Sequence, residues 1–142
     1  MFLVGSHAQE LPKTLPETVL TVPYAPHGAV FARAAAVVHQ GGIGTTGQAM
    51  RASRPMLVVP FAHDQFDNAE RLRRLGAAEV LPQTRYTARR AEDRLHRLLT
   101  QPGYATAAAR IGESVRGENG SAAAAEAIEQ VRQKFRKSVK PF

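Results

Sequence analysis

Apolar residues in the first half of the chain gather in short continuous runs and do not alternate with polar ones. Runs of this kind are typical of strands that are buried on both faces of a sheet. They predict strands over residues 2–5, 18–22, 35–39, 56–60 and, more weakly, 78–82.

Between these runs the apolar spacing changes to that of helices. The pattern predicts helices over 28–34, 45–53 and 67–75, and Asp67 with Glu70 resembles a capping box at the start of the third. Strands that alternate with helices form a parallel sheet with right-handed crossovers. We therefore predict an α/β fold with a parallel sheet of about five strands flanked by helices.

Beyond residue 85 the sequence predicts only helices. Apolar residues share one face of the first of them: Ala91, Leu95, Leu98 and Leu99. Pro102 and Gly103 break it, a second helix follows near 104–116, and Asn119 caps a last one that ends near 136.

Length and composition add few constraints. A chain of 142 residues suits one domain, which we divide into an α/β part (1–85), a helical part (86–137) and a tail (138–142). The absence of cysteine excludes disulfides and thiolate metal sites, and the histidines lack metal-ligand spacing, so we predict no metal. Without a basic leader or an apolar run long enough to span a bilayer, we expect a cytoplasmic protein with no transmembrane segment.

The net charge of +7 is unevenly distributed. Residues 71–97 carry eight arginines, and the C-terminal "RQKFRKSVKPF" adds five cations and no acid. A basic surface is compatible with nucleic acid, but no aromatic residues are interleaved as stacking platforms. A solvated helix face with a frayed tail is the preferred interpretation, and we predict no nucleic-acid partner.

The stretch "VVHQGGIGTTGQAM" (37–50) joins a predicted strand to a predicted helix through a glycine-rich turn. Such a turn directs free backbone N–H groups and the positive end of the helix dipole at one point, which makes an anion site. The same stretch also fits a plain connection with Thr45 as the N-cap. Its spacing matches neither a dinucleotide-binding motif nor a P-loop.

The stretch "VVPFAHDQFDNAERL" (58–72) places a polar cluster after the next predicted strand. Ligands of open parallel sheets bind outside the carboxyl ends of the strands, so this cluster and the glycine turn are expected to face one crevice. Carboxylate and amide groups such as Asp64 and Gln65 suit sugar hydroxyls. A loop with an ordinary helix cap remains the alternative.

Together these stretches, from Tyr24 to Leu81, resemble the nucleotide-sugar-binding signature of family 1 GT-B glycosyltransferases, such as UDP-glucuronosyltransferases and bacterial antibiotic glycosyltransferases. The GT-B fold has two Rossmann-like domains, an N-terminal one for the acceptor and a C-terminal one for the nucleotide-sugar donor. The resemblance covers only the later part of the C-terminal domain. It therefore implies a single, truncated, Rossmann-like donor-binding domain with a helical C-terminal end.

The resemblance also implies roles for individual residues. The donor diphosphate would be bound at the glycine turn by Gln40, Gly42, Ile43, Gly44 and Thr45. The donor sugar would be bound by Asp64, Gln65 and Asn68, and the base and ribose by Tyr24, His27 and Gln48.

Two positions depart from the family pattern. Many members have His where this chain has Gln40, and many have Glu where it has Gln48. An amide can donate to phosphate but carries no positive charge, so we expect weaker diphosphate binding or another donor preference. His39, one residue earlier, is interpreted as a packing residue at the strand end.

The implied reaction is transfer of a hexose from a UDP- or TDP-sugar to an acceptor hydroxyl, with inversion and without a cofactor. In the family the catalytic base lies in the acceptor domain, so we assign no catalytic residue here, and whether the chain alone is an enzyme stays open. The alternative is a non-catalytic nucleotide-binding or self-associating module. Expected partners are an acceptor-binding domain or subunit and a second copy of the chain.

Overall fold

The computed structural model describes residues 1–6 and 8–138, so residues 139–142 of the predicted tail lie outside the described residues. All five predicted strands are present, each shorter than predicted: β1 (Phe2–Leu3), β2 (Thr21–Val22), β3 (Val37–His39), β4 (Met56–Val58) and β5 (Ala78–Val80). Every pairing between them is parallel, as predicted.

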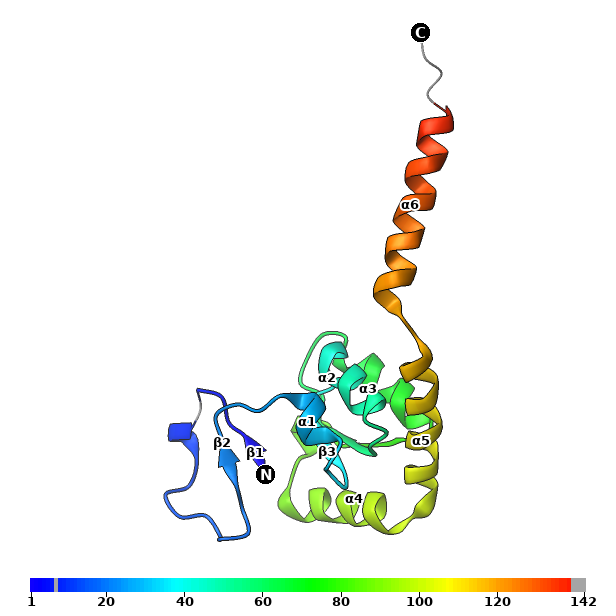
Figure 1. The fold of residues 1–142 in the computed structure, drawn as a ribbon. Coiled ribbons are helices and arrows are strands. Elements are labelled where there is room, and N and C mark those ends of the chain that lie inside the picture. The colour runs from blue at the N-terminus through cyan, green and yellow to red at the C-terminus, as the bar shows by residue number, and fades with distance from the viewer. Residues whose placement is uncertain (7, 139–142) are drawn as a thin grey trace.

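The helices follow the predicted order. They are α1 (His27–Phe31), α2 (Ile43–Arg51), α3 (Gln65–Arg74), α4 (Ala88–Thr100), α5 (Pro102–Gly117) and α6 (Gly120–Ser138), with short 3₁₀ turns at Ala8–Glu10 and Gln83–Arg85. The predicted α/β fold with a helical C-terminal end is confirmed (Figure 1). Among the described residues, no helix has both the length and the apolar character that a membrane span requires.

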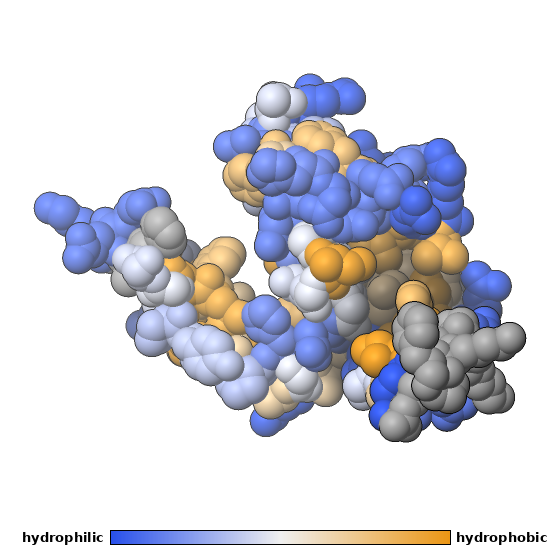
Figure 2. Space-filling model, turned by 90° about the horizontal axis from the view of Figure 1, so that it is seen from above, coloured by the Kyte–Doolittle hydropathy of each residue, from blue (hydrophilic) through white to orange (hydrophobic). Residues whose placement is uncertain are grey.

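The strands are divided between two sheets instead of one. β1 and β2 form a two-stranded sheet, and β3, β4 and β5 form a three-stranded sheet in that order. Figure 1 shows the β1–β2 pair standing to one side of the body, joined to it by the segment 23–26 that leads into α1. We call residues 1–22 the N-terminal lobe; the space-filling view shows it projecting from the body (Figure 2).

β4 of the three-stranded sheet is buried on both faces, which explains its continuous apolar run, whereas Val38 of β3 is 50% exposed. One face packs against α2, α3 and α5 through a cluster of buried residues: Phe31, Val37, Ala49, Met56, Val58, Ala69, Leu72, Ala77, Ala78, Ala108 and Ile111. The other face packs against α4 through a second cluster: Leu57, Val59, Leu81, Ala91 and Leu98. The core is therefore centred on β4, whose three residues are fully buried.

One predicted helix start was wrong. Asp67 and Glu70 make no capping box, because α3 begins at Gln65 and both carboxylates pair with arginines of the next turn. The predicted break at Pro102 is confirmed, since α4 ends at Thr100, but α5 begins at Pro102 itself, where the first turn needs no N–H from proline. The predicted cap of α6 is confirmed, since the Ala122 N–H donates to Asn119 Oδ1 at 3.1 Å.

α6 extends away from the body (Figure 1), and exposed apolar residues form a stripe along it. Ile128, Val131 and Phe135 recur at helical spacing and are 70%, 54% and 69% exposed. A stripe of this kind on a surface helix normally faces a protein core or a partner.

Glu79 of β5 is a buried carboxylate, with 7% of its surface exposed. Tyr104 of α5 donates its hydroxyl to this carboxylate at 2.5 Å, and Arg94 and Arg97 of α4 also donate to it. Burial raises the pKa of Glu79, but the hydrogen bonds from Tyr104 and Arg94 outweigh burial and leave the pKa below its usual value. The Glu79 carboxylate thus links α4 and α5 to β5 through hydrogen bonds.

We expect Glu79→Gln to lower the free energy of unfolding by about 2 kcal/mol at neutral pH, because hydrogen bonds to a charged acceptor are replaced by weaker ones. The pKa of Glu79 is lower in the folded than in the unfolded chain. Its carboxylate therefore stabilises the fold above the unfolded value of about 4.3, and this contribution is lost as pH falls through the folded pKa. Urea unfolding at a series of pH values measures the difference between variant and parent, which should shrink in acid.

The matched control is Glu113→Gln on the exposed side of α5, which should change the free energy of unfolding by less than about 0.5 kcal/mol. A Glu79→Gln difference that does not depend on pH would contradict the assignment.

Candidate functional site

The glycine turn between β3 and α2 can be built only with glycine at its first position. Gly41 has φ +93°, in the left-handed region. A Cβ there would lie 2.9 Å from Val58 Cγ1 and 3.1 Å from the Gln65 carbonyl oxygen. The chain can therefore pass directly over the ends of β4 and α3, which brings the turns after β3 and β4 into contact.

The N-terminus of α2 is open on its outer side. Gly42 is the N-cap, and the first helical hydrogen bond runs from the Thr46 N–H to the Gly42 carbonyl. The backbone N–H groups before Thr46 lie in the first turn, where a helix supplies no acceptor for them. Ile43 is 66% exposed, and a Cβ on Gly44 would meet nothing within 4 Å. The alternative with Thr45 as N-cap was wrong.

His39 is hydrogen-bonded to the backbone of this turn. Its Nδ1 accepts the Gly41 N–H at 3.0 Å, so in the neutral ring the proton is on Nε2. The side chain is 8% exposed, and burial, helped by the nearby His27, lowers the pKa of His39 to about 4. His39 is thus a neutral packing residue, as predicted. It also accepts a hydrogen bond from the glycine turn, and this second role was not predicted from the sequence. The available signal was a histidine two residues before Gly41.

Two buried polar atoms near this turn have no hydrogen-bond partner among the described residues: His39 Nε2 and Thr46 Oγ1. Thr46 is 3% exposed. Buried polar groups in folded proteins nearly always have a partner, in protein, water or ligand. These two atoms are therefore groups that a bound polar molecule or water could satisfy.

Asn68 joins the two turns. Its side-chain amide donates to the Gly41 carbonyl at 2.9 Å and to Asp64 Oδ2 at 2.8 Å. The glycine turn and the polar cluster after β4 therefore lie together at the carboxyl edge of the sheet, as the strand order predicts. Asn68 uses both amide hydrogens inside the protein, which leaves its carbonyl oxygen for a ligand.

Gln65 and Asp64 occupy the start of α3. Gln65 Oε1 accepts the N–H groups of Phe61 and Ala62 at 2.8 and 3.2 Å, so the side chain folds back over its own loop. Its amide hydrogens take part in neither of these bonds. Asp64 is exposed. The pair can offer a carboxyl acceptor and amide donors side by side.

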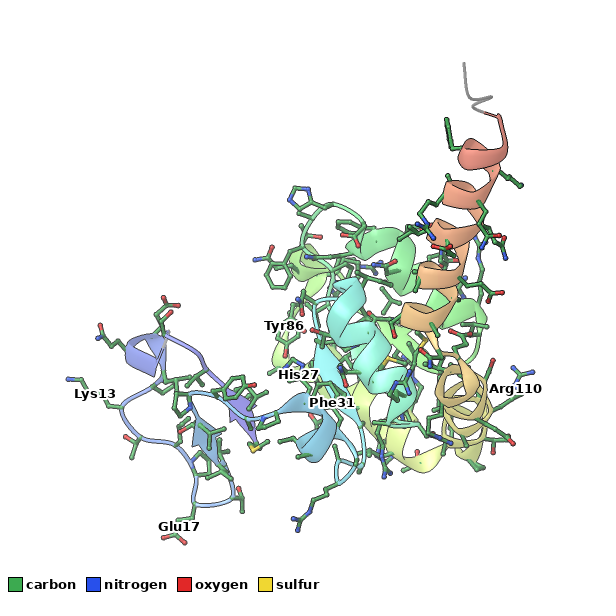
Figure 3. The ribbon with its side chains drawn as sticks, turned by 45° about the horizontal axis from the view of Figure 1, so that its top comes forward. Lys13, Glu17, His27, Phe31, Tyr86 and Arg110 are labelled. Carbon is green, nitrogen blue, oxygen red and sulfur yellow. The ribbon has the colours of Figure 1, made fainter. Side chains whose placement is uncertain are left out.

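The other predicted residues lie around α1 and α2. His27 stacks on Phe31 with ring centroids 4.7 Å apart, and Figure 3 shows both side chains on α1. Gln48 Oε1 lies 4.0 Å from the place a Cβ of Gly28 would take, so α1 and α2 bring Gln48 near His27. Tyr24 stands apart on the segment between β2 and α1 and is 78% exposed.

Gln40 lies against the turn itself. Its Nε2 is 3.1 Å from the position that a Cβ of Gly42 would take, and its side chain is exposed. An amide donor therefore stands beside the N-terminus of α2, in the position predicted for diphosphate binding. A glycine at residue 42 leaves room for it.

Two hollows lie elsewhere. One of about 970 Å³ follows α4 and is lined by five arginines: Arg85, Arg89, Arg90, Arg94 and Arg97. The other, of about 610 Å³, lies beside Glu79 and Tyr104. Neither is lined by a residue of the two turns.

Comparison with known proteins identifies relatives. The family model described as "Erythromycin biosynthesis protein CIII-like, C-terminal domain" matches residues 2–131. O-mycaminosyltylonolide 6-deoxyallosyltransferase of Streptomyces fradiae is 40% identical over 117 residues, which cover 82% of this chain and 28% of that protein.

Solved structures of glycosyltransferases also resemble this chain. The glycosyltransferase VinC, crystallised in complex with DTDP, matches with a TM-score of 0.71 and 36% identity over 74% of this chain and 27% of VinC. The glycotransferase of kitacinnamycin matches with a TM-score of 0.79 and 29% identity over 89% of this chain and 33% of its own. The chain thus spans about a third or less of the length of these relatives.

We expect His39 to stay neutral down to about pH 4, as its buried position requires. The unfolded histidine pKa of about 6.5 is higher, so stability should fall as pH is lowered from about 6.5 towards about 4, by roughly 3 kcal/mol in total. Titration of the imidazole resonances by NMR measures the pKa directly. His27→Asn should raise the pKa of His39, because a repelling charge is removed. A His39 pKa near 6.5 would contradict the assignment of a buried, neutral imidazole.

Proposed function

The chain belongs to the family of erythromycin biosynthesis protein CIII-like C-terminal domains, which is found in family 1 GT-B glycosyltransferases, and we propose that it binds a nucleoside-diphosphate sugar as the donor half of such an enzyme. The observation that carries the proposal is the open N-terminus of α2, with free N–H groups in its first turn and Asp64 and Gln65 beside it.

The diphosphate suits the turn at residues 40–45. Backbone N–H groups at the start of a helix and the helix dipole favour an anion there. Gly42 and Gly44 allow phosphate oxygens to approach the backbone, and the Gln40 amide and the Thr45 hydroxyl can donate to them. Because Gln40 is neutral and His39 is deprotonated, no full positive charge of these residues faces the phosphates.

The sugar suits the start of α3. Asp64 can accept hydrogen bonds from two hydroxyls, and the Gln65 amide can donate to another. Asn68 fixes Asp64 and the glycine turn at a constant separation, and its free carbonyl oxygen can contact the same sugar. The ribose and base would then extend towards Gln48 and His27 on α1 and α2, with exposed Tyr24 as the stacking residue.

The reaction that this arrangement supports is inverting transfer of a hexose to an acceptor hydroxyl. Negative charge develops on the departing UDP or TDP, and the preorganised donors of the turn stabilise it more than they stabilise the bound donor. The step needs no cofactor from this chain. The base that deprotonates the acceptor would come from an acceptor-binding domain or subunit, so we propose that residues 1–142 alone do not catalyse transfer.

A second candidate is a non-catalytic module that binds nucleotide or associates with itself. The observation that favours it is the pair of exposed apolar side chains Ile128 and Val131 on α6, which a second copy could cover. Pairing with an acceptor-binding domain separates the two candidates: sugar transfer by the pair supports the donor half, whereas nucleotide affinity with no transfer under any pairing supports the module.

Calorimetric titration with UDP, TDP and GDP tests the proposed site. We expect saturable binding of UDP or TDP, lost in Gly44→Val because the added side chain fills the open space over the first turn of α2. Thr45→Ala should weaken binding by about tenfold, as loss of one hydrogen bond to a charged group predicts.

The matched control is Gly47→Val, one turn later in α2, where a Cβ also meets nothing within 4 Å. It carries the same cost in helix propensity but lies away from the N-terminus, so affinity should be kept. Equal loss of binding in both valine variants would contradict the proposed location of the site.

A further inference from the structure

A row of arginines follows the end of β5 and runs along α4. Five of them line the hollow of about 970 Å³, together with Glu92, Asp93 and His96. Residues 80–82 are the only apolar part of its lining. Figure 1 shows α4 along the lower border of the body, on the side opposite to α6. None of the residues that we assign to the donor lines this hollow.

Three arginines of this hollow lack an acidic partner. The other two are bound to Glu79, whereas Arg85, Arg89 and Arg90 form no ion pair within the described part of the chain. Arg90 donates to the Arg85 carbonyl at 3.0 Å, which is an uncharged acceptor. Like charges held close together repel each other, so a carboxylate placed between these guanidinium groups would be attracted to all of them.

The start of α4 concentrates the positive charge further. Arg89 and Arg90 lie in its first turn, which contains no acidic residue. The N-terminus of a helix carries the positive pole of its dipole, so cations are unfavourable there and anions are favoured. The two arginines therefore repel both the helix end and each other, and a bound anion would relieve this repulsion.

The lining favours a polypeptide over other anions. Pockets for small molecules are lined mainly by apolar and aromatic side chains, which are a minority here. Single strands of nucleic acid are bound with aromatic stacking platforms, and this lining has none. Glu92 and Asp93 stand among the arginines and would repel a uniform chain of phosphates. A polypeptide, in contrast, can carry carboxylates only at the positions that face arginine.

β5 adds backbone groups with which a polypeptide can pair. The Leu81 N–H donates to the Val58 carbonyl at 2.9 Å, so Leu81 bonds towards β4. Backbone groups alternate in side along a strand, so the N–H and C=O of Val80 point away from β4. Val80 lines the hollow, and no strand pairs with this side of β5 among the described residues. The hollow thus offers both a donor and an acceptor beside the arginines.

The spacing of the arginines fits an extended segment. Arg90 and Arg94 are separated by about 6 Å along the axis of α4. Every second residue of an extended chain faces the same side, at intervals of about 6.6 Å. Carboxylates at alternate positions can therefore each meet one arginine. The row from Arg89 to Arg97 is about 12 Å long, a length that about four extended residues span.

We propose that this hollow binds an extended acidic segment of a partner protein. Carboxylates at alternate positions of the segment bond to Arg85, Arg89 and Arg90, and its backbone pairs with Val80. The partner is a different protein and not a second copy, because two chains of net charge +7 repel each other. The interaction does not depend on nucleotide binding.

A peptide titration tests the hollow. A fluorescein-labelled peptide of alternating glutamate and serine is titrated with the full chain, and its fluorescence anisotropy is measured. We expect saturable binding, which is absent when glutamine replaces glutamate in the peptide. Arg85→Gln/Arg89→Gln should weaken binding about fivefold, because two exposed ion pairs are lost.

The matched control is Arg33→Gln/Arg110→Gln, which removes the same charge from exposed positions that do not line the hollow. It should change the affinity by less than about twofold, because the net charge acts only at long range through screening salt. Equal weakening in both double variants would contradict the proposal, since binding would then follow the overall charge of the chain.

Two further measurements locate the peptide. Glu92→Gln should strengthen binding by about twofold, because a carboxylate that repels the peptide is removed. With saturating peptide, the Val80 amide should exchange its hydrogen at least about tenfold more slowly, because it gains a partner. The Leu81 amide, already bonded to Val58, is the internal control and should change little.

Two other outcomes would overturn the proposal. One is a Val80 amide that exchanges equally fast with and without bound peptide, because the proposed segment lies along β5. The other is tighter binding of single-stranded oligodeoxythymidylate or of phosphatidylserine vesicles than of the peptide, with the same dependence on Arg85 and Arg89. That result would assign the hollow to nucleic acid or to a membrane surface.

Discussion

The contact between the glycine turn and the start of α3 is the constraint on which the candidate site depends. Gly41 sits in a left-handed conformation with Val58 and Gln65 too close for any side chain, and Asn68 holds its carbonyl. Because the same amide also bonds to Asp64, the N-termini of α2 and α3 form one rigid unit. The two ends of a donor molecule would therefore meet groups whose separation is fixed before binding, which favours tight recognition.

Much of this arrangement could be predicted from the sequence. Continuous apolar runs placed all the strands, and the rule that parallel strands present their carboxyl ends at one edge placed the two polar stretches together. The hydrogen bond that joins them could not be predicted: Asn68 was expected to contact the donor sugar, and its bond to the Gly41 carbonyl forms only because the fold brings together residues 27 positions apart. The role of His39 was missed for the same reason: its partner lies in the turn that the fold creates.

The predicted single sheet and the observed pair of sheets differ for a physical reason. Apolar runs report that a strand is buried on its faces but say nothing about its edges, since edge pairing uses backbone groups that every residue carries. β1 and β3 each read as interior strands, yet each has one unpaired side. Similarly, the arginines of 71–97 read as a uniform basic face, whereas Arg94 and Arg97 are bound to Glu79 and Arg71 to Asp67. Part of the positive charge of this segment is thus neutralised by ion pairs within the fold.

The link between the N-terminal lobe and the body has a mechanical consequence. It contains two prolines, whose rings fix φ, and the carbonyls of both accept backbone hydrogen bonds: Pro23 from Gly5 and Pro26 from Ala29 and Val30. A glycine-rich link would leave many backbone conformations open, whereas the two fixed φ angles of this link reduce their number. Less conformational entropy is therefore lost when the position of the lobe becomes fixed.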